Sequence, residues 1–469
     1  MLVITNWRDL DHPEAGGAEV VCQELAQRFA RDGRDVVLVC ADVPGAPREE
    51  VRDGYRIVRG GGRFTVYGHA LLWLLRNRDR VDGVVDSQNG IPFFTPLVLR
   101  STTPVLMLLH HVHQDQFAKY FPAPVAAVGR WLESAGSRAV YRRRGILAVS
   151  PSTRTDARRR LGLRGEIWVT PPGWSVSEQV RTAPPERTPH PSVVCLGRLV
   201  PHKRTEMVIQ AFPTVLNRVP DARLTIVGRG TEAPRLRQLA ADLGVADAVT
   251  FKEGLDDLQR DQVLSSAWMT VNASQGEGWG LSVVEANALG VPALAFRRPG
   301  LRDSIVDGET GWLIDDDTDL GEAVVAALGE LRDEGRAHQV AQHARRWASR
   351  FTWDAMAQRV LGALESERRA LALGGRDRRT SSDVSTVVTV PLTALPENWQ
   401  DALRRADAWE RSGDTVSLLC RGADTQNVSR VLERLGVRDE DTSRNRVSVS
   451  VARTADLLRL SSPAAQGSA

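Results

Sequence analysis

Short apolar runs alternate along most of this chain with longer amphipathic stretches, and this alternation limits the fold more than any other feature. Such a pattern is typical of parallel sheets covered by helices, because each crossover between parallel strands needs about a dozen residues or more. The strands expected in the first half are Leu2–Thr5, Val36–Cys40, Gly83–Asp86, Val105–Leu109 and Ile146–Ser150. Those expected in the second half are Val193–Gly197, Arg223–Val227, Val249–Phe251, Met269–Ala273 and Ala293–Phe296. The sequence therefore predicts an α/β fold with two doubly wound domains.

A proline-rich segment separates the two sets of strands. Residues 181–192 read RTAPPERTPHPS, and prolines without a backbone N–H interrupt both helices and sheets, so we expect a linker there. The two domains are then residues 1–180 and 193–349. In open α/β sheets the ligand crevice lies at the carboxyl ends of the strands, so we expect the substrate site between the domains.

The rest of the chain divides into three further segments. Residues 350–372 have helical periodicity through Trp353, Met356 and Val360, and residues 373–385 are polar and rich in glycine and charge. Residues 386–469 predict a small α+β extension, to which the sequence assigns no role. Its expected strands are Val387–Leu392, Val416–Cys420 and Val447–Val451, its helices are Trp399–Arg411 and Val428–Leu435, and Ser461–Ala469 is expected to be disordered.

Composition excludes several classes of protein. The 61 basic and 58 acidic residues among 469 leave a net charge of +3, so nothing demands a nucleic-acid partner. The four cysteines, Cys22, Cys40, Cys195 and Cys420, are too widely spaced for a disulfide or metal framework and fit a reducing cytosol. No run reaches the roughly 20 apolar residues of a membrane span, and we see no signal peptide. We therefore expect a cytoplasmic protein.

Two glutamates stand eight positions apart in the segment SQGEGWGLSVVEA, residues 274–286. The pattern predicts a strand, a Gly-Trp-Gly turn holding Glu277, and a helix holding Glu285. The amides of Trp279, Gly280 and Leu281 then lie at the helix start. Carboxylates accept paired hydrogen bonds from vicinal hydroxyls, and helix-start amides attract phosphate oxygens, so the segment suits a sugar attached to a phosphate. The alternative is a loop carboxylate and a solvated helix residue.

This pair of glutamates resembles the signature of the family 4 glycosyltransferases, which are retaining enzymes of the GT-B fold. The resemblance covers about the first 370 residues and implies two Rossmann-like domains facing a central cleft. In that family the first glutamate holds hydroxyls of the donor sugar and the second holds the ribose of the nucleotide. Glu277 and Glu285 take these roles by resemblance.

A basic loop follows the expected strand at Val193. Gly197 and Arg198 end the strand, and Lys203 follows five residues later, so two cations reach one point at the sheet edge. The segment resembles the family's Gly-Arg-Leu with a downstream lysine, which implies that Arg198 and Lys203 bind the donor diphosphate. It departs from the pattern at Arg204, where many relatives have glycine. A solvated basic loop is the alternative.

Two glycines precede the first expected helix. Gly16 and Gly17 let backbone amides approach a phosphate, and no dinucleotide fingerprint G-x-G-x-x-G follows the strand. The turn resembles the family's Gly-Gly-Ala-Glu, which faces the donor diphosphate. Glycine pairs otherwise serve only to turn the chain.

Three histidines, His110, His111 and His113, follow the expected strand Val105–Leu109. In the family a histidine at this point contacts the donor sugar, and we place it at His110, with His111 as the second choice. His113 is assigned to the acceptor side or the loop. A zinc site is the alternative, although no acidic or cysteine partner stands nearby.

Further residues are assigned by family likeness alone. Gly228, Lys252 and Gly254 are expected to border the nucleotide base and ribose. We expect Trp174 and the arginine-rich residues 129–144 to contact an acceptor or anionic lipid, which would give peripheral contact at the inner membrane face. Asp303 and Glu309 are expected to serve loop and cap geometry.

The sequence thus predicts a retaining glycosyltransferase that moves a sugar from a nucleotide-diphosphate donor to a hydroxyl acceptor. No metal or cofactor is expected, because no Asp-x-Asp pair is present in the expected places and the two cations supply the charge. Acceptor choice is assigned to the loops Val58–Tyr67 and Val112–Val128. Two alternatives stay open: a sensor or assembly subunit that binds nucleotide sugars without turnover, and a GT-B epimerase. The donor nucleotide, its sugar, the acceptor and the oligomeric state are not set by the sequence.

Overall fold

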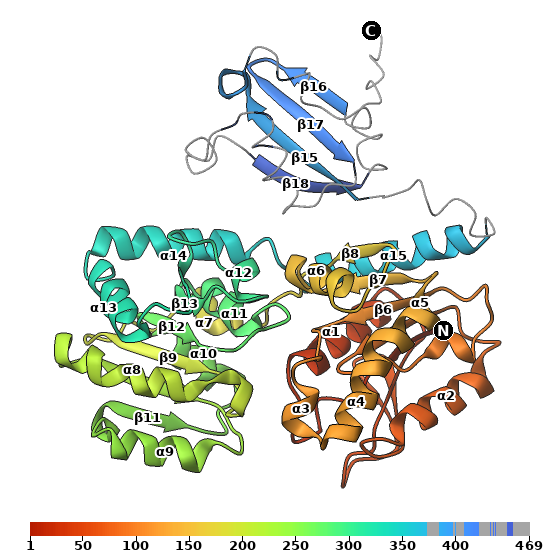
Figure 1. The fold of residues 1–469 in the computed structure, drawn as a ribbon, viewed down its shortest axis with the longest axis horizontal. Coiled ribbons are helices and arrows are strands. Elements are labelled where there is room, and N and C mark those ends of the chain that lie inside the picture. Colours follow the sequence, from red (N-terminus) through yellow and green to blue (C-terminus); the bar gives the residue numbers. More distant parts are fainter. Residues whose placement is uncertain are drawn as a thin grey trace. The chain divides into compact units, whose positions relative to one another are not determined.

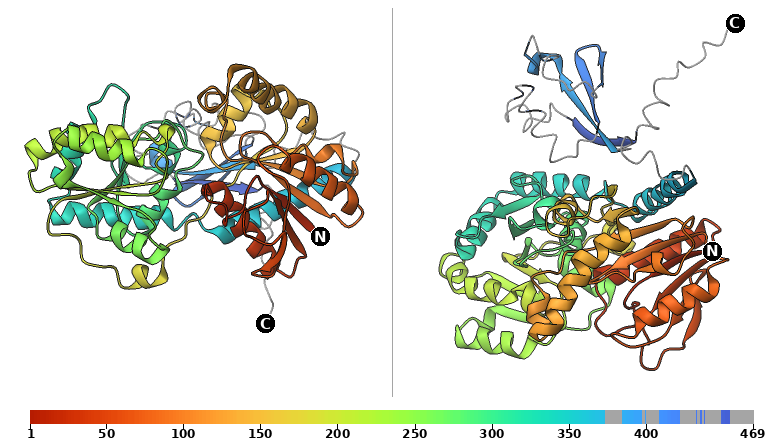
Figure 2. Two further views of the ribbon diagram at one scale, coloured as in Figure 1. Left: turned by 90° about the horizontal axis from the view of Figure 1, so that it is seen from below. Right: turned by 45° about the vertical axis from the view of Figure 1, so that its right-hand side comes forward.

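The computed structural model describes residues 1–372, 384–396, 399, 408–421, 432, 435, 437 and 448–453. It contains two compact units, Met1–Leu371 and Ala372–Ala469, which we describe separately. The first unit holds two α/β domains, which appear as separate lobes in Figures 1 and 2. Among the described residues, none of the helices is both long and apolar enough to cross a bilayer.

The first domain is built on an eight-stranded sheet in the order β3-β4-β2-β1-β5-β6-β7-β8. All neighbours are parallel except β3 and β4, which form a hairpin. Its strands are β1 (Leu2–Thr5), β2 (Val36–Cys40), β3 (Glu49–Arg52), β4 (Tyr55–Arg59), β5 (Gly83–Gln88), β6 (Val105–Leu109), β7 (Gly145–Ala148) and β8 (Ile167–Val169). Both faces are covered, as parallel sheets require.

Most helices of the first domain bury apolar residues, although α3 (Phe117–Tyr120) buries none. Along α1 (Gly17–Arg31), Val21, Leu25 and Phe29 are buried at helical spacing. The helix α6 (Pro151–Arg159) is capped at its start, because the Ser150 hydroxyl accepts a hydrogen bond from the amide of Thr153. The others are α2 (Val66–Asn77), α4 (Ala123–Trp131), a π turn at Leu132–Gly136 and α5 (Ser137–Tyr141).

The second domain has a six-stranded, fully parallel sheet in the order β11-β10-β9-β12-β13-β14. Its strands are β9 (Ser192–Leu196), β10 (Arg223–Val227), β11 (Val249–Lys252), β12 (Met269–Asn272), β13 (Ala293–Phe296) and β14 (Gly311–Ile314). Its helices are α8 (Thr205–Arg218), α9 (Ala233–Asp242), α10 (Asp257–Ser265), α11 (Leu281–Ala288), α12 (Leu301–Ser304), α13 (Leu320–Glu330) and α14 (Glu334–Ala348). The predicted α/β fold with two doubly wound domains is confirmed.

The expected linker, residues 181–192, follows the crossing between the domains, because Val180 of α7 (Glu178–Thr182) packs against second-domain residues. This helix ends at Thr182 and β9 begins at Ser192, so only residues 183–191 have no regular structure. The four prolines of the linker stretch all lie in this irregular part.

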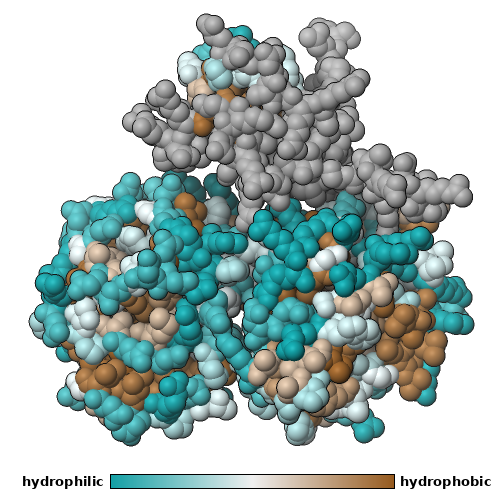
Figure 3. All heavy atoms as spheres, in the orientation of Figure 1, coloured by the Kyte–Doolittle hydropathy of each residue, from teal (hydrophilic) through white to brown (hydrophobic). Residues whose placement is uncertain are grey.

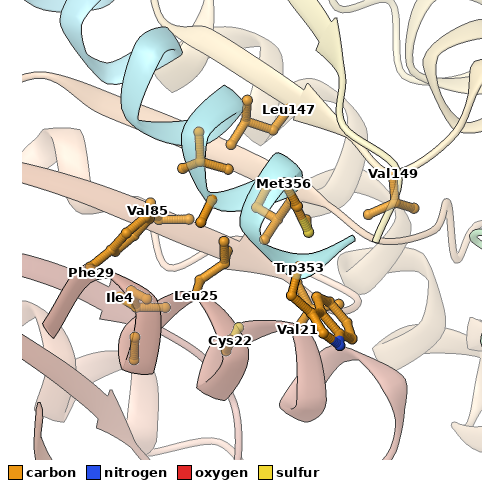
Figure 4. Packing of buried hydrophobic residues seen from close by; sticks show 14 of the residues in the cluster. Ile4, Val21, Cys22, Leu25, Phe29, Val85, Leu147, Val149, Trp353 and Met356 are labelled. Atoms are coloured by element: carbon orange, nitrogen blue, oxygen red, sulfur yellow. The ribbon is translucent and has the colours of Figure 1, made fainter. Parts of the chain in front are cut away.

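The chain returns to the first domain through α15 (Trp353–Ala372). Figure 4 shows Trp353 and Met356 of this helix packed against Val21 and Leu25 of α1. The Arg28 guanidinium donates to Asp354 Oδ1 over 2.7 Å, and the Glu367 carboxylate accepts from the amide of Gly145 over 3.2 Å. The two domains are therefore joined by two crossings of the chain.

All ten strands predicted for the two domains are present, within two residues at either end. Four others, β3, β4, β8 and β14, were missed, because they are short and two of them carry charged residues. The interpretation of Val58–Tyr67 and Val112–Val128 as loops is wrong in part. Strand β4 continues to Arg59 and α2 begins at Val66, and α3 and most of α4 lie within the second segment.

The second unit contains a four-stranded antiparallel sheet in the order β16-β17-β15-β18. Its strands are β15 (Val384–Pro391), β16 (Ala408–Ser412), β17 (Thr415–Arg421) and β18 (Ser448–Arg453). The three predicted strands are present. The prediction of a helix over Trp399–Arg411 is wrong at its end, because the residues from Ala408 onward form strand β16. This strand pairs with β17 through a two-residue turn at Gly413, which has a left-handed φ of 58°. The rest of that helix, most of Val428–Leu435, and Ser461–Ala469 lie outside the described residues.

Candidate functional site

A cavity of about 380 Å³ lies between the two domains. Its wall comes from the loops that follow β1, β5, β6 and β7 on one side and β9 and β12 on the other. These are the carboxyl ends of both sheets, where open α/β folds place their ligands. We call this cavity the cleft.

An ion pair crosses the second-domain wall of the cleft. Lys203 Nζ lies 2.5 Å from Glu277 Oε1, and the Ser274 hydroxyl donates to the same oxygen over 2.7 Å. The two charged side chains are only 22% and 16% exposed. Burial opposes ionisation of Glu277, but Lys203 and the Ser274 hydroxyl outweigh it and hold the pKa of this carboxyl below its usual value. Glu277 is thus a carboxylate at neutral pH.

The loop that carries Glu277 is fixed by close backbone contacts. The amide of Glu277 donates to the carbonyl of Pro299 over 3.0 Å. A Cβ on Gly278 would lie 2.1 Å from the His110 carbonyl oxygen, so a side chain at this position would collide with the other domain. The Thr153 hydroxyl also donates to the Gly278 carbonyl. The glycine therefore lets the two walls of the cleft meet.

Glu285 lies one turn into α11 and faces the cleft beside Arg260. Withdrawal from solvent raises the pKa of Glu285 to about 7, while the Arg260 charge lowers it. Arg260 is itself held by Asp257, by Asp261 and by the Ser175 carbonyl. Glu285 is therefore only partly ionised at neutral pH.

The turn before α11 places backbone amides in the cleft wall. Gly280 takes a left-handed φ of 89°, which glycine adopts without strain, and the helix begins at Leu281. The Trp279 side chain is buried and packs edge-on against Phe351, with ring centroids 4.8 Å apart. Its ring anchors the turn, so the part of Trp279 free to meet a ligand is chiefly its backbone.

The glycine turn of the first domain faces the second domain across the cleft. A Cβ on Gly16 would lie 3.5 Å from Arg198 Nε, and one on Gly17 would lie 2.9 Å from Leu281 Cδ1. Arg198 is exposed, and its guanidinium donates to the Glu14 carbonyl over 3.4 Å. Glu19 accepts from the amide of Gly16 over 2.7 Å and so caps its own helix.

Arg8 is a cleft residue that sequence reasoning missed. It follows β1, lies almost fully buried in the wall, and pairs with Glu14 over 2.8 Å and with Glu19 over 3.4 Å. Its burial lowers the pKa of the guanidinium, but an arginine remains charged. The only signal in the sequence was a cation directly after the first predicted strand. Arg260 and His202 also line the cleft without having been predicted.

The histidines line the first-domain wall. His110 Nε2 lies 2.9 Å from the Ser87 hydroxyl, which donates to Asn6 Oδ1 over 2.9 Å. Burial lowers the pKa of His110 and of His111 to about 3, so both imidazoles are neutral at neutral pH. Among the residues that the structure describes, which include all three histidines, no group of three His, Cys, Asp or Glu side chains is placed to hold a metal ion. The zinc alternative therefore finds no ligand set here.

Three predicted donor-binding residues do not line the cleft: Gly228, Lys252 and Gly254. A Cβ on Gly228 would lie 1.8 Å from the Gly197 carbonyl oxygen, so Gly228 lets two strand-end loops pack together. Gly254, with a left-handed φ of 71°, lies similarly close to Arg229. Lys252 ends β11 at the sheet edge. All other predicted site residues line the cleft, including Gly197.

Two further expectations concern residues outside the cleft. Asp303 accepts from the amides of Gly300 and of Ser152, so it caps a helix start and ties the two domains together. The Trp174 indole donates to the Ala348 carbonyl over 2.8 Å and packs on an apolar cluster that both domains share. The interpretation of Trp174 as an acceptor contact has no support in this packing.

The fold and the cleft define a GT-B glycosyltransferase, and comparison with known proteins agrees. The model of the glycosyl transferases group 1 matches residues 176–347, and that of glycosyltransferase family 4 matches residues 15–178. Together they cover more than half of the chain. The protein belongs to the family 4 glycosyltransferases, as the two glutamates had indicated.

Individual relatives match parts of the chain. A GDP-mannose-dependent alpha-(1-6)-phosphatidylinositol monomannoside mannosyltransferase of Mycolicibacterium smegmatis is 36% identical over 189 residues, 38% of this chain and 49% of that protein. A D-inositol 3-phosphate glycosyltransferase of Acidothermus cellulolyticus is 37% identical over 199 residues, 40% and 42% of the two chains. The matches thus span about half the length of these relatives. The sucrose-phosphate synthase of Thermosynechococcus elongatus shares the fold, with a TM-score of 0.64 at 20% identity over 79% of this chain and 99% of that one.

Proposed function

We propose that this chain is a retaining glycosyltransferase that moves a sugar from a nucleotide-diphosphate donor to the hydroxyl of an acceptor. One observation carries the proposal. The Lys203–Glu277 pair, 2.5 Å apart, and the exposed Arg198 guanidinium line one cavity at the carboxyl ends of both sheets. A cationic and an acidic group in one cleft match the diphosphate and the hydroxyls of a nucleotide sugar.

The cations bind the leaving group. Arg198 and Lys203 contact the diphosphate from the second domain, Arg8 adds charge from the first, and the amides of Gly17 and Leu281 approach from opposite walls. As the glycosyl bond breaks, charge grows on the diphosphate, and these preorganised groups stabilise it without reorganising. We assign them the charge neutralisation that a metal ion supplies elsewhere, so no metal is needed.

The acidic groups bind the hydroxyls. Glu277 is ionised and accepts hydrogen bonds from the sugar, and Glu285 beside Arg260 accepts from the ribose. His110 is neutral and fixed by Ser87, so it orients the sugar as a hydrogen-bonding group rather than as an acid. Gly228, Lys252 and Gly254 have no part in this arrangement.

In the transfer step the bond between the anomeric carbon and the diphosphate oxygen breaks, and its electron pair leaves with the diphosphate. A bond forms between the same carbon and the acceptor oxygen on the same face. The acceptor proton passes to the departing diphosphate oxygen, so no enzymic nucleophile or base is required. The barrier falls through positioning and electrostatic stabilisation.

The names of the relatives suggest the first substrates to test. One relative is named for GDP-mannose and a phosphatidylinositol mannoside, and the other for D-inositol 3-phosphate. We therefore propose GDP-mannose as the first donor and a phosphorylated inositol as the first acceptor.

The test is release of nucleoside diphosphate from a panel of GDP-, UDP- and ADP-sugars, with the anomeric configuration of the product read by NMR. Diphosphate release that depends on acceptor, with the donor configuration kept, supports the proposal. Tight binding without release of diphosphate would instead favour the sensor, and an altered donor sugar without acceptor would favour the epimerase.

A further inference from the structure

A second cavity, of about 390 Å³, adjoins the cleft on the side of the first domain. The two cavities share six lining residues: Arg8, Asn89, His113, Gln116, Arg198 and His202. A single ligand can therefore extend from one into the other. A hydroxyl at this junction lies close to where the donor sugar is bound under the proposed function.

The wall of this second cavity combines several aromatic rings with aliphatic side chains, and we call it the aromatic pocket. Phe64 comes from the loop before α2, Phe117 from α3, and Phe121 from the loop before α4, with the rings of Phe64 and Phe121 6.3 Å apart. Trp7, Tyr67 and Tyr120 also line the pocket, together with aliphatic side chains that include Val128. Such rings are normally covered by the rest of the chain.

The rim of the aromatic pocket exposes large apolar side chains. Phe64 is 65% exposed and Val128 is 57% exposed. In Figure 3 hydrophobic residues gather on this face of the first domain, in the region where Figure 1 places α3 and α4. Burying these side chains against a ligand is favourable, whereas leaving them in water is not.

Positive charge lies on the wall of the aromatic pocket and where the pocket meets the cleft. The Arg63 guanidinium lies 5.0 Å from the centre of the Phe121 ring and 5.7 Å from that of Phe64. Arg8 and Arg198 line the junction, and Glu14, the acidic residue of the pocket lining, is paired with Arg8. The arrangement suits an anion joined to a hydrocarbon chain.

We propose that the acceptor is a lipid that carries a phosphate, with its hydrocarbon chain in the aromatic pocket and its phosphate at the cationic junction. This rests on the proposed function, because the transfer described above then takes place onto a hydroxyl of the lipid head group. A soluble phosphorylated acceptor has no hydrocarbon chain that could cover the exposed aromatic rim. The enzyme therefore collects its acceptor from a membrane surface, while the donor arrives from solution.

The test compares three small probes by calorimetry on the full chain: octyl phosphate, ethyl phosphate and octanol. Octyl phosphate is expected to bind on the order of a hundredfold more tightly than ethyl phosphate, because several more methylene groups are buried. It is also expected to bind at least about tenfold more tightly than octanol, through the cations. Equal affinity for octyl and ethyl phosphate would refute the binding of a hydrocarbon chain. Equal affinity for octyl phosphate and octanol would refute the recognition of a phosphate head group.

Two variants locate the binding site. Phe64→Ser and Val128→Ser are each expected to reduce the advantage of octyl over ethyl phosphate about tenfold. The matched control is Leu97→Ser, an equally exposed apolar residue at 67% outside both cavities, which should leave the advantage unchanged. If all three variants behave alike, the chain binds elsewhere and the inference fails.

The proposed function fails by a different result. If no nucleotide sugar loses its diphosphate in the wild-type protein, the transferase is refuted whatever the probes show. A different result separates the two proposals. If sugar is transferred to soluble inositol phosphates as fast as to phosphatidylinositol in vesicles of equal parts phosphatidylcholine and phosphatidylinositol, the proposed transferase activity is supported and the lipid acceptor is refuted.

Discussion

Lys203→Met removes one cation from the cleft and keeps most of the apolar stem. The ammonium of Lys203 lies 2.5 Å from Glu277, and both groups are largely withdrawn from water. Loss of one preorganised contact to the leaving group typically costs about 3 to 4 kcal/mol, or a hundredfold to a thousandfold in kcat. We expect kcat to fall by at least about a hundredfold.

The same substitution leaves Glu277 with only the Ser274 hydroxyl as a polar partner. Because Lys203 holds the pKa of Glu277 down, its removal raises that pKa, and the folded state loses about 1 to 3 kcal/mol, between the values for exposed and buried pairs. In Lys203→Met/Glu277→Gln the uncompensated carboxylate is gone. The double variant should therefore lose less stability than the two single variants together.

The assay is diphosphate release under saturating donor, with kcat and KM determined separately, and urea unfolding for stability. Arg237→Met is the matched control, because it breaks an ion pair of 2.7 Å with Glu253 outside the cleft lining. A Lys203→Met enzyme that turns over within a few fold of wild type would refute the assignment of Lys203 to the diphosphate. Additive stability losses in the double variant would refute the coupling.

Three further outcomes are expected. Donor affinity should rise as the pH increases through about 7, because the Glu285 carboxyl then ionises and accepts hydrogen bonds from the ribose. The Glu285→Gln variant should show a weaker pH dependence of affinity. Both are measured by titrating the protein with the nucleoside diphosphate at several pH values. Gly278→Ala should lower stability by about 1 to 3 kcal/mol through its clash with the His110 carbonyl, whereas Gly276→Ala, whose Cβ would lie an ordinary 3.7 Å from His111, should leave Tm unchanged. Dialysis against EDTA should leave kcat unchanged, since arginine and lysine supply the charge; a loss restored by Mg²⁺ would contradict this.

Much of the fold could be predicted from the sequence, because its central strands are buried on both faces and therefore appear as continuous apolar runs. Val36–Cys40 and Val105–Leu109 are unbroken apolar runs and match the observed strands. The edge strand Glu49–Arg52 reads EEVR, and its pairing with β4 comes from the hairpin, not from its own apolar content. Residues 408–411 were misread as the end of a helix because their strand depends on pairing with β17 across a two-residue turn, not on their own apolar pattern.

The candidate site was legible where one short segment carries several groups. Glu277 and Glu285 lie on one turn and helix, so their spacing alone indicated a site. Arg8 stands alone in its segment and becomes a cleft residue only when β1 is placed opposite β9. The aromatic pocket could not be predicted from the sequence, because Trp7, Phe64 and Phe121 are far apart in the chain and come together only on folding. Gly228, predicted to border the donor, does not line the cleft, and the structure shows instead a packing reason for its glycine, the close approach of Gly197.

The return of α15 to the first domain has a mechanical consequence. The first crossing precedes α7, because Val180 of that helix packs in the second domain, and the second lies between Ala348 and Trp353. The two crossings lie side by side, since a Cβ on Gly173 would be 2.3 Å from the Trp353 amide nitrogen. We therefore expect any opening of the cleft to pivot at this one place, so that Arg198 and the glycines at 16 and 17 return to the same relative positions when it closes.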